Sequence, residues 1–193
     1  MSDKVFAGSD TWATSYTLSR TIQKIGRFDI IICGKQAIDG DTAQVGPGIA
    51  AFLDVPQITF VKKIEEIATI NQHGHNESRA TNDERRLIRA ERMTEEGYDI
   101  IESPLPCVIT VVKEINEPRL PSLKGKMRAK KIEIKRLEAK DLDADPDSLG
   151  LKGSPTKVVK IFTPPPRKGG QILQGEVKEV CGKLLELLKG EIS

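Results

Sequence analysis

The residues of this sequence that could do chemistry gather in a polar loop at residues 35–48, with the sequence KQAIDGDTAQVGPG. Its aspartates can accept hydrogen bonds from amides or hydroxyls, and its threonine and glutamine can donate them. The backbone amides that follow would begin a helix, and free amides at a helix N-terminus attract anions. A phosphate would suit this place, but an ordinary strand-to-helix turn with an aspartate cap explains the same pattern. The groups concerned belong to Asp39, Asp41, Thr42, Gln44, Val45 and Gly46.

Three segments must hold this loop. Residues 28–34 are a short apolar run that ends in Gly34, which is typical of a parallel strand buried on both faces. The apolar, alanine-rich residues 49–53 predict a helix, which Pro56 brings to an end because proline lacks an amide hydrogen. Residues 57–61 then predict another strand. The order strand, loop, helix, strand indicates a βαβ unit around the loop.

Further elements flank this unit on both sides. Residues 10–25 predict an amphipathic helix capped by Ser9 or Asp10, because apolar residues recur at helical spacing. Alternating patterns at 86–93 and 98–102 predict a β-hairpin. The apolar residues 107–112 predict a second buried strand of the same parallel sheet. The fold class is therefore α/β, with a parallel sheet and an added β-hairpin.

Independent catalysis is not supported by the sequence. Both histidines, His73 and His75, lie in the polar, aperiodic stretch 66–84, which predicts an exposed loop, and no third metal ligand accompanies them. No G-x-S-x-G motif, cysteine–histidine pair or carboxylate cluster is present. The three cysteines are unclustered and odd in number, which favours a reduced, cytoplasmic compartment.

The overall composition excludes other classes. A formal net charge of +2 gives no global reason to expect a nucleic-acid or membrane partner, and 38% hydrophobic residues argue against disorder of the whole chain. No apolar run is long enough to span a bilayer. Residues 119–136 form one local basic patch with a single acid, Glu133. Because this patch lacks aromatic residues for base stacking, a solvated helix or a protein-docking surface is favoured over RNA binding, which would weaken steeply with salt.

The C-terminal part has a different character. Residues 141–170 are rich in Asp, Pro, Gly and Lys and predict an extended arm, and residues 175–189 predict a final helix with a broad apolar face. We therefore divide the chain into an α/β domain at 1–136 and an arm with a helix at 137–193.

Several motifs in order closely resemble the beta subunit of electron-transfer flavoproteins, the EtfB/FixA family. The strongest is GKQAIDGDTAQVGP at 34–47, and FAGSDTWAT at 6–14 precedes it. The region 90–110, NEPRLP at 116–121 and AKKIE at 129–133 continue the resemblance. It covers nearly the whole chain, although residues 68–84 resemble an insertion. Family members begin with further strands and helices, so the chain resembles the C-terminal two-thirds of the subunit.

The resemblance implies a parallel-sheet, Rossmann-like adenine-nucleotide-binding fold that works in a heterodimer with an alpha subunit. Such heterodimers accept electrons from acyl-CoA or other dehydrogenases, or from NADH in bifurcating members, and pass them on. The beta subunit holds FAD or AMP, and the motif is more similar to the bacterial and anaerobic members, which favours FAD. The residues that match the nucleotide loop are Asp39, Asp41, Thr42, Ala43, Gln44, Val45 and Gly46.

The resemblance also assigns partner contacts. Leu123 matches the loop that docks dehydrogenases, with Arg128, Lys130 and Lys131 beside it, and the C-terminal arm resembles the segment that embraces the alpha subunit. The alternative is a nucleotide-binding α/β module without a redox role, which would need neither the docking segment nor the arm.

Overall fold

The computed structural model describes residues 1–70, 85–166, 170 and 172–191. The chain divides into two compact units, Met1–Lys157 and Val158–Ser193, which we describe separately. The predicted loop with His73 and His75 lies outside the described residues.

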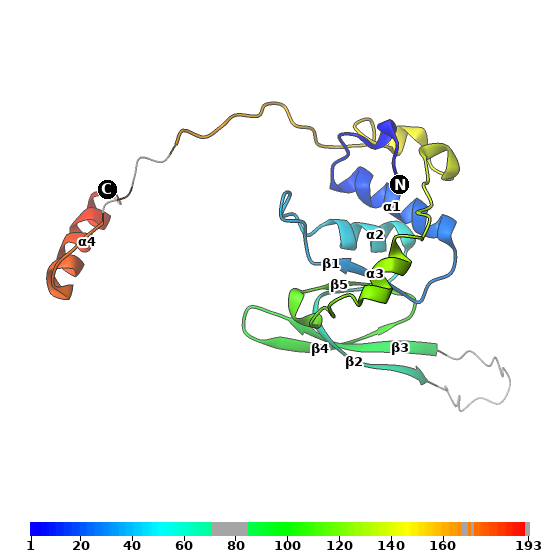
Figure 1. Ribbon diagram of the computed structural model, residues 1–193, viewed down its shortest axis with the longest axis horizontal. Helices are drawn as coiled ribbons and strands as arrows, with labels where there is room; N and C mark the ends of the chain where they lie inside the picture. Colours follow the sequence, from blue (N-terminus) through cyan, green and yellow to red (C-terminus); the bar gives the residue numbers. More distant parts are fainter. Residues whose placement is uncertain (71–84, 167–169, 171, 192–193) are drawn as a thin grey trace. The chain divides into compact units, whose positions relative to one another are not determined.

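A mixed five-stranded sheet forms the centre of the first unit (Figure 1). Its order is β1 (Ile30–Gly34), β5 (Cys107–Val111), β2 (Gln57–Ile70), β3 (Arg85–Met93) and β4 (Tyr98–Pro104). β5 pairs in parallel with both β1 and β2, whereas β3 pairs antiparallel with β2 and β4. The predicted α/β class, the hairpin and the parallel placement of 107–112 are confirmed.

The prediction that β1 is buried on both faces was wrong. Ile31 and Cys33 pack against the helices, but Ile32, which faces the opposite side, is 63% exposed. The reason is that α1 and α2 pack on only one face of the sheet, and Ile32 lies on the other face. A run of apolar residues indicates that a strand is apolar, but it does not show whether both faces are covered.

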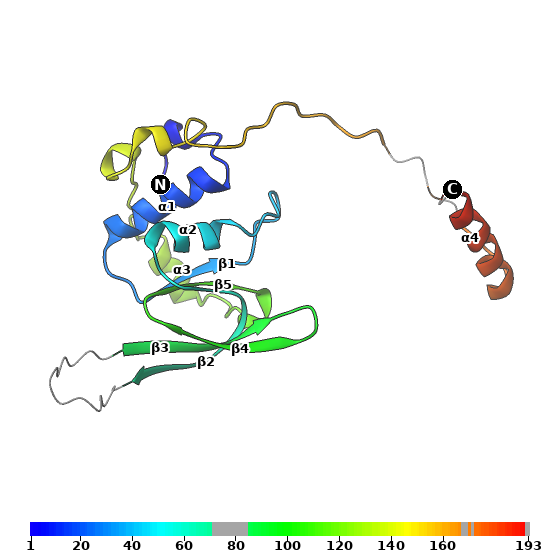
Figure 2. The same ribbon diagram turned by 180° about the vertical axis from the view of Figure 1, so that it is seen from behind.

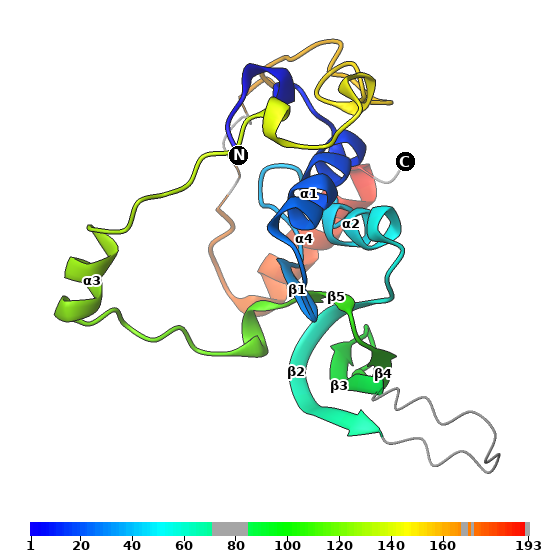
Figure 3. The ribbon, with the colours of Figure 1, turned by 90° about the vertical axis from the view of Figure 1, so that its right-hand side faces the viewer.

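β2 is longer than predicted. The polar stretch that begins at residue 66 was expected to be a loop, yet β2 continues to Ile70 through antiparallel pairing with β3. Shifts in register between Val61 and Lys63 and between Ile64 and Glu66 accompany the curvature of β2, which Figure 3 shows. Such bulges let a long strand bend, so its polar residues do not mark its end.

Two helices, α1 (Thr11–Ile25) and α2 (Val45–Leu53), cover one face of the sheet, as Figure 2 shows from behind. Asp10 caps α1 as predicted, because its side chain accepts a hydrogen bond from the amide of Ala13. Ile49 and Ala50 of α2 bury themselves against Val108 of β5. The ring of Phe52 meets Trp12 and Tyr16 of α1 edge-on, with centroids 4.8 and 5.4 Å apart.

Residues beyond the sheet return to α1. A short helix, α3 (Leu123–Ala129), comes first, and turns of 3-10 helix follow at Ala139–Asp141 and Pro146–Ser148. Leu142 and Leu149 are buried, and the amide of Asp145 donates to the hydroxyl of Tyr16 at 2.8 Å. The first compact unit therefore extends past the predicted boundary at 136/137.

The second unit contains one regular element, α4 (Val177–Glu191), among its described residues. This confirms the final helix predicted at 175–189. Within this unit its apolar side chains remain substantially exposed, among them Val177, Leu184, Leu185, Leu187 and Leu188. In the part of the chain that the structure describes, no helix has the length and apolar character needed to cross a bilayer.

Close packing fixes the start of α2. A Cβ atom added to Gly46 would lie 2.4 Å from Cγ2 of the buried Thr110, whereas one added to Gly40 would have no neighbour within 4 Å. We expect Gly46→Ala to lower the free energy of unfolding by about 1–3 kcal/mol, because the core must shift to admit the methyl group. Gly40→Ala, the matched control, should change it by less than about 0.5 kcal/mol. Urea denaturation of the full chain measures both, and equal stability of the two variants would contradict the packing argument.

Candidate functional site

A pocket of about 500 Å³ lies where the N-terminal ends of α1 and α2 meet the returning segment near residue 155. Most of the residues that line it are polar, although the larger part of the lining surface is apolar. Its lining consists of Ser9, Asp10, Thr11, Trp12, Thr14, Thr42, Gln44, Val45, Pro155 and Thr156. The pocket thus brings together the two motifs that the sequence singled out at 6–14 and 34–47.

Hydrogen bonds inside the loop after β1 fix its path. The amide of Lys35 donates to the carbonyl of Val111 at 2.9 Å, which extends the pairing of β1 with β5. The amide of Asp41 donates to the carbonyl of Ala37 at 2.9 Å, and the side-chain amide of Gln36 donates to the Asp41 carboxylate. The loop therefore closes on itself before it reaches α2.

Two residues of this loop adopt left-handed backbone conformations. Asp41 has φ 51° and Ala43 has φ 54°. An alanine is strained in this conformation because its Cβ approaches the backbone, and such strain persists only where the surrounding structure imposes it. Strain of this kind is typical of functional sites, and here it lies on both sides of Thr42.

The N-terminus of α2 has no side-chain cap. Gln44 occupies the cap position without bonding to the helix amides, and its Oε1 instead accepts a hydrogen bond from the Thr11 hydroxyl at 2.8 Å. Pro47 contributes no amide hydrogen, so Val45 and Gly46 supply the first ones. Polar side chains and uncapped amides at one pocket can bind an anionic group such as a phosphate.

Asp10 connects α1 with the returning segment. One carboxylate oxygen accepts from the amide of Ala13 at 3.0 Å, and the other accepts from the amide and the hydroxyl of Thr156, each at 2.9 Å. The amide of Asp10 donates to Oγ of Ser154 at 2.9 Å. Burial raises the pKa of Asp10, but these hydrogen bonds lower it by more, so its pKa lies below 3.8.

The predicted nucleotide-loop residues divide into two groups. Thr42, Gln44 and Val45 line the pocket. Asp39, Asp41, Ala43 and Gly46 do not line it: the Asp39 carboxylate accepts from the amide of Gly40 at 3.0 Å, and Gly46 packs against Thr110. Pro155 and Thr156 were missed because the sequence places them in an arm of low complexity, and no local signal shows that they fold back onto α1.

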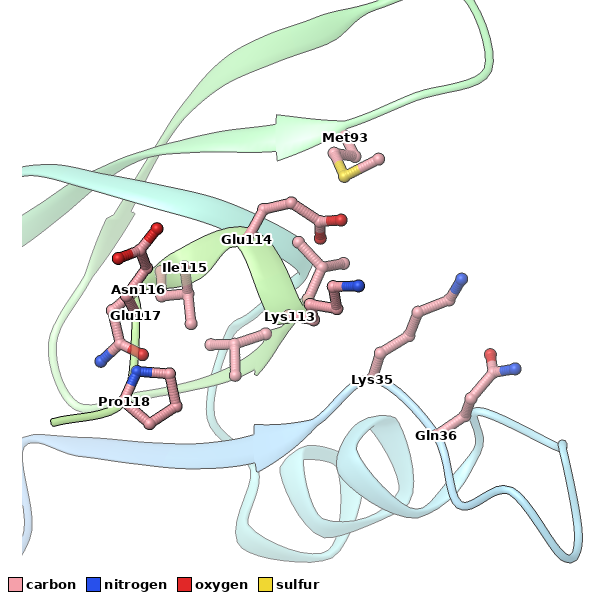
Figure 4. Close-up of a pocket in the computed structure, with 11 residues that line it drawn as sticks. Lys35, Gln36, Met93, Lys113, Glu114, Ile115, Asn116, Glu117 and Pro118 are labelled. Carbon is pink, nitrogen blue, oxygen red and sulfur yellow. The ribbon is translucent and has the colours of Figure 1, made fainter. Parts of the chain in front are cut away.

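A second, larger cleft of about 1240 Å³ lies at the carboxyl ends of β1 and β5 (Figure 4). Its lining combines the start of the loop with the segment after β5, and includes Lys35, Gln36, Met93 and residues 111–118. Sequence reasoning missed this cleft, although the carboxyl ends of parallel strands are where ligands of such sheets commonly bind.

The predicted docking residues lie on and just after α3, which stands apart from the sheet between two extended segments (Figure 3). Ser122 caps this helix by accepting from the amide of Gly125 at 3.1 Å. Leu123 is 77% exposed, and Arg128, Lys130 and Lys131 are exposed as well. Together they form a basic surface around an exposed leucine. Among the described residues, no group of three His, Cys, Asp or Glu side chains is arranged to hold a metal ion.

The sequence is similar to proteins of known family. The model of the electron transfer flavoprotein domain matches residues 1–142. An electron transfer flavoprotein subunit beta from Thermoanaerobacterium thermosaccharolyticum is 47% identical over 189 residues, which cover 97% of this chain and 66% of that protein. The corresponding subunit of Megasphaera elsdenii is 46% identical over 91% of this chain and 61% of its own length.

A subunit of a different assembly is also similar. The caffeyl-CoA reductase-Etf complex subunit CarD of Acetobacterium woodii is 40% identical over 98% of this chain and 66% of its own length. The chain thus spans slightly less than two thirds of the length of these relatives.

The hydrogen bonds of Asp10 predict a pH-dependent stability. Because its pKa is lower in the folded chain, Asp10 stabilises the fold above about pH 4, and this contribution is lost as the pH falls through the lowered pKa. At pH 7, Asp10→Ala should lower the free energy of unfolding by about 0.5–2 kcal/mol, the usual effect of losing such a cap.

The control, Asp10→Asn, keeps an acceptor for Ala13 but loses the charge. Its deficit relative to the unmodified chain should shrink between pH 7 and pH 3, as measured by urea denaturation at each pH. A deficit that stays constant over this range would contradict the assignment.

Proposed function

The chain belongs to the electron transfer flavoprotein family, with its beta subunits and FixA proteins, and from this premise we propose that it serves as the beta-subunit partner in an electron-carrying heterodimer. With an alpha subunit it would accept electrons from acyl-CoA or other dehydrogenases, or from NADH, and pass them to a downstream acceptor. Its own contribution would be to hold a nucleotide cofactor and to present a docking surface.

The observation that carries the nucleotide site is the pocket that Thr42, Gln44 and Val45 share with the N-terminal end of α1. The uncapped start of α2 offers amides to a phosphate, and the hydroxyl of Thr42 offers a further donor. Asp39, Asp41, Ala43 and Gly46 would act indirectly, by holding the loop in its strained path and α2 against the sheet. Donors gathered at one pocket suit the phosphate of an adenine nucleotide, while the Asp10 carboxylate, which also lines the pocket, is engaged by its hydrogen bonds from Ala13 and Thr156.

We propose FAD as this nucleotide, with AMP as the alternative. The family is one of flavoproteins, and one relative by name forms part of a reductase-Etf complex. That similarity supports a redox-active cofactor in this chain. The residues present would bind the phosphate and the adjoining ribose, and FAD would supply the electron-accepting ring system when bound.

The proposed docking surface consists of Leu123 with Arg128, Lys130 and Lys131. An apolar side chain surrounded by exposed charges is suited to a transient partner, because the charges accelerate encounter and the apolar contact slows dissociation. The basic charge favours a dehydrogenase with an acidic rim. In the second unit, the exposed apolar side chains of α4 suit burial against an alpha subunit.

A nucleotide-binding module without a redox role is the alternative function. It would use the same pocket, but it gives no reason for an exposed leucine within a basic helix or for the exposed apolar side chains of α4. The two functions differ in whether a flavin-containing complex forms with an alpha subunit.

The nucleotide can be identified directly. The chain is co-expressed with an alpha subunit from the same source, and the purified complex is denatured to release its nucleotides for chromatography. We expect two FAD per heterodimer, whereas one FAD with one AMP would select the simpler electron carrier.

Thr42→Val should weaken binding of the nucleotide about 2- to 10-fold through loss of a hydrogen bond. Thr69→Val, at an exposed position of β2, is the control. A complex that carries no nucleotide beyond that of the alpha subunit would exclude the proposed pocket.

The docking surface predicts a change in electron-transfer kinetics. Leu123→Ala should reduce affinity for an acyl-CoA dehydrogenase about tenfold, because truncating a central apolar anchor removes roughly 1.4 kcal/mol. Lys131→Glu should slow association and weaken its dependence on salt. Stopped-flow measurement of flavin reduction at several salt concentrations tests both. Lys24→Glu, an equal charge change at the exposed end of α1, should leave the rate nearly unchanged, and equal slowing by the two charge reversals would argue against a local docking surface.

A further inference from the structure

The cleft at the carboxyl ends of β1 and β5 is separate from the proposed nucleotide pocket. Beside the large cleft lies a smaller cavity of about 460 Å³, and the two share Lys35, Met93 and Val112. The smaller cavity adds Phe60, Arg92, Thr94 and Glu95. None of the residues that line the nucleotide pocket lines either cavity.

Phe60 reaches this cleft through a strained backbone. Its φ is 58°, a left-handed value that bulky residues rarely adopt, and it lies at a break in the register between Ile58 and Val61. Its amide donates to the hydroxyl of the Thr110 side chain at 3.0 Å, at the point where the regular pairing of β2 with β5 is interrupted. A bulge of this kind redirects a side chain. Here it brings the aromatic ring under Lys35, whose Nζ lies 5.3 Å from the ring centroid.

Arg92 lines the same cavity with an unsatisfied donor. Its Nε is buried and has no hydrogen-bond partner among the described residues. Leaving a buried donor unpaired costs about 1–3 kcal/mol, and more for a charged group. Because Nε has almost no accessible surface, a ligand in the cavity does not reach it, and what Arg92 offers there is the positive charge of its guanidinium.

The charged side chains that line the cleft do not form ion pairs with one another. Lys35, Arg92 and Lys113 form no ion pair with any described residue, although Glu95, Glu114 and Glu117 also line the two cavities. Figure 4 shows the ammonium groups of Lys35 and Lys113 directed toward the same opening, with the Glu114 carboxylate toward Met93. The cationic side of the cleft is therefore the Lys35 side, next to the apolar surfaces of Phe60 and Met93.

We propose that this cleft binds a small aromatic anion, with its carboxylate or phosphate between Lys35 and Arg92 and its ring against Phe60 and Met93. Lys35 and Arg92 supply positive charge, and the redirected phenylalanine with the methionine thioether gives an apolar surface for a ring. The site consists of residues other than those of the proposed nucleotide pocket, so the two binding proposals can be tested independently.

Titration of the isotopically labelled full chain, followed by NMR, tests the proposal. Phenyl phosphate and benzoate are the probes, and the tighter of the two identifies the preferred anion. We expect saturable shifts of the amide signals of Lys35, Phe60 and Arg92 and little change at residues 42–46. Titration with AMP should show the opposite pattern, which separates failure of this site from failure of the nucleotide pocket.

Variants make the test quantitative. Lys35→Ala should weaken binding of the better probe about tenfold, and Arg92→Gln at least as much. Lys24→Ala is the control for loss of an exposed lysine and should leave affinity unchanged. Because Arg92 is partly buried, its variant is compared only if its amide spectrum shows that the chain is still folded. If it does not, Lys35→Ala, a substitution at an exposed position, is the variant that tests the proposal. Absence of saturable shifts with both probes, or equal weakening by Lys24→Ala and Lys35→Ala, would overturn the proposal.

Discussion

The close approach of α2 to its neighbours is the constraint on which the rest of the site depends. Added Cβ atoms at Gly46 and Gly48 would meet Thr110 of β5 and Ser15 of α1 at 2.4 and 2.3 Å, so only glycine lets the helix begin here. The helix axis and the end of β1 then fix both ends of the intervening loop. Within this loop the chain turns back on itself through the hydrogen bond between the amide of Asp41 and the carbonyl of Ala37, and Asp41 and Ala43 adopt left-handed conformations.

The same loop links the two clefts. Lys35, at its start, lines the cleft at the carboxyl ends of the strands, and Gln36 both lines that cleft and donates to Asp41. Asp41 is followed directly by Thr42, which lines the proposed nucleotide pocket. A ligand that moves Gln36 must therefore disturb the hydrogen bond that holds the turn before Thr42. The two sites are chemically separate, but they share one strained segment.

The helices and strands could be predicted from the sequence better than their burial, their length and their contacts with distant segments. The βαβ unit, the Asp10 cap, the hairpin and the final helix could be predicted because the spacing of apolar and capping residues within each segment indicates them. The exposure of Ile32, the length of β2 and the contacts of Thr156 with Asp10 depend on pairing between distant segments. Phe60 is the clearest case, because no residue type signals a bulge that forces an aromatic residue into a left-handed conformation. For the site, Thr42, Gln44 and Val45 could be predicted, whereas the returning segment that closes the pocket could not.

The proposed sites separate recognition of a small anion from recognition of a protein. At the proposed nucleotide pocket the donors are the Thr42 hydroxyl and the first backbone amides of α2, whose positions are fixed by packing. Around α3, Arg128, Lys130 and Lys131 would act over distance, whereas exposed apolar side chains such as Leu123 and Met127 would make the close contacts. A net charge of only +2 for the whole chain means that this basic surface is balanced by acids elsewhere. The proposed docking surface is therefore a local concentration of charge and not a property of the whole chain.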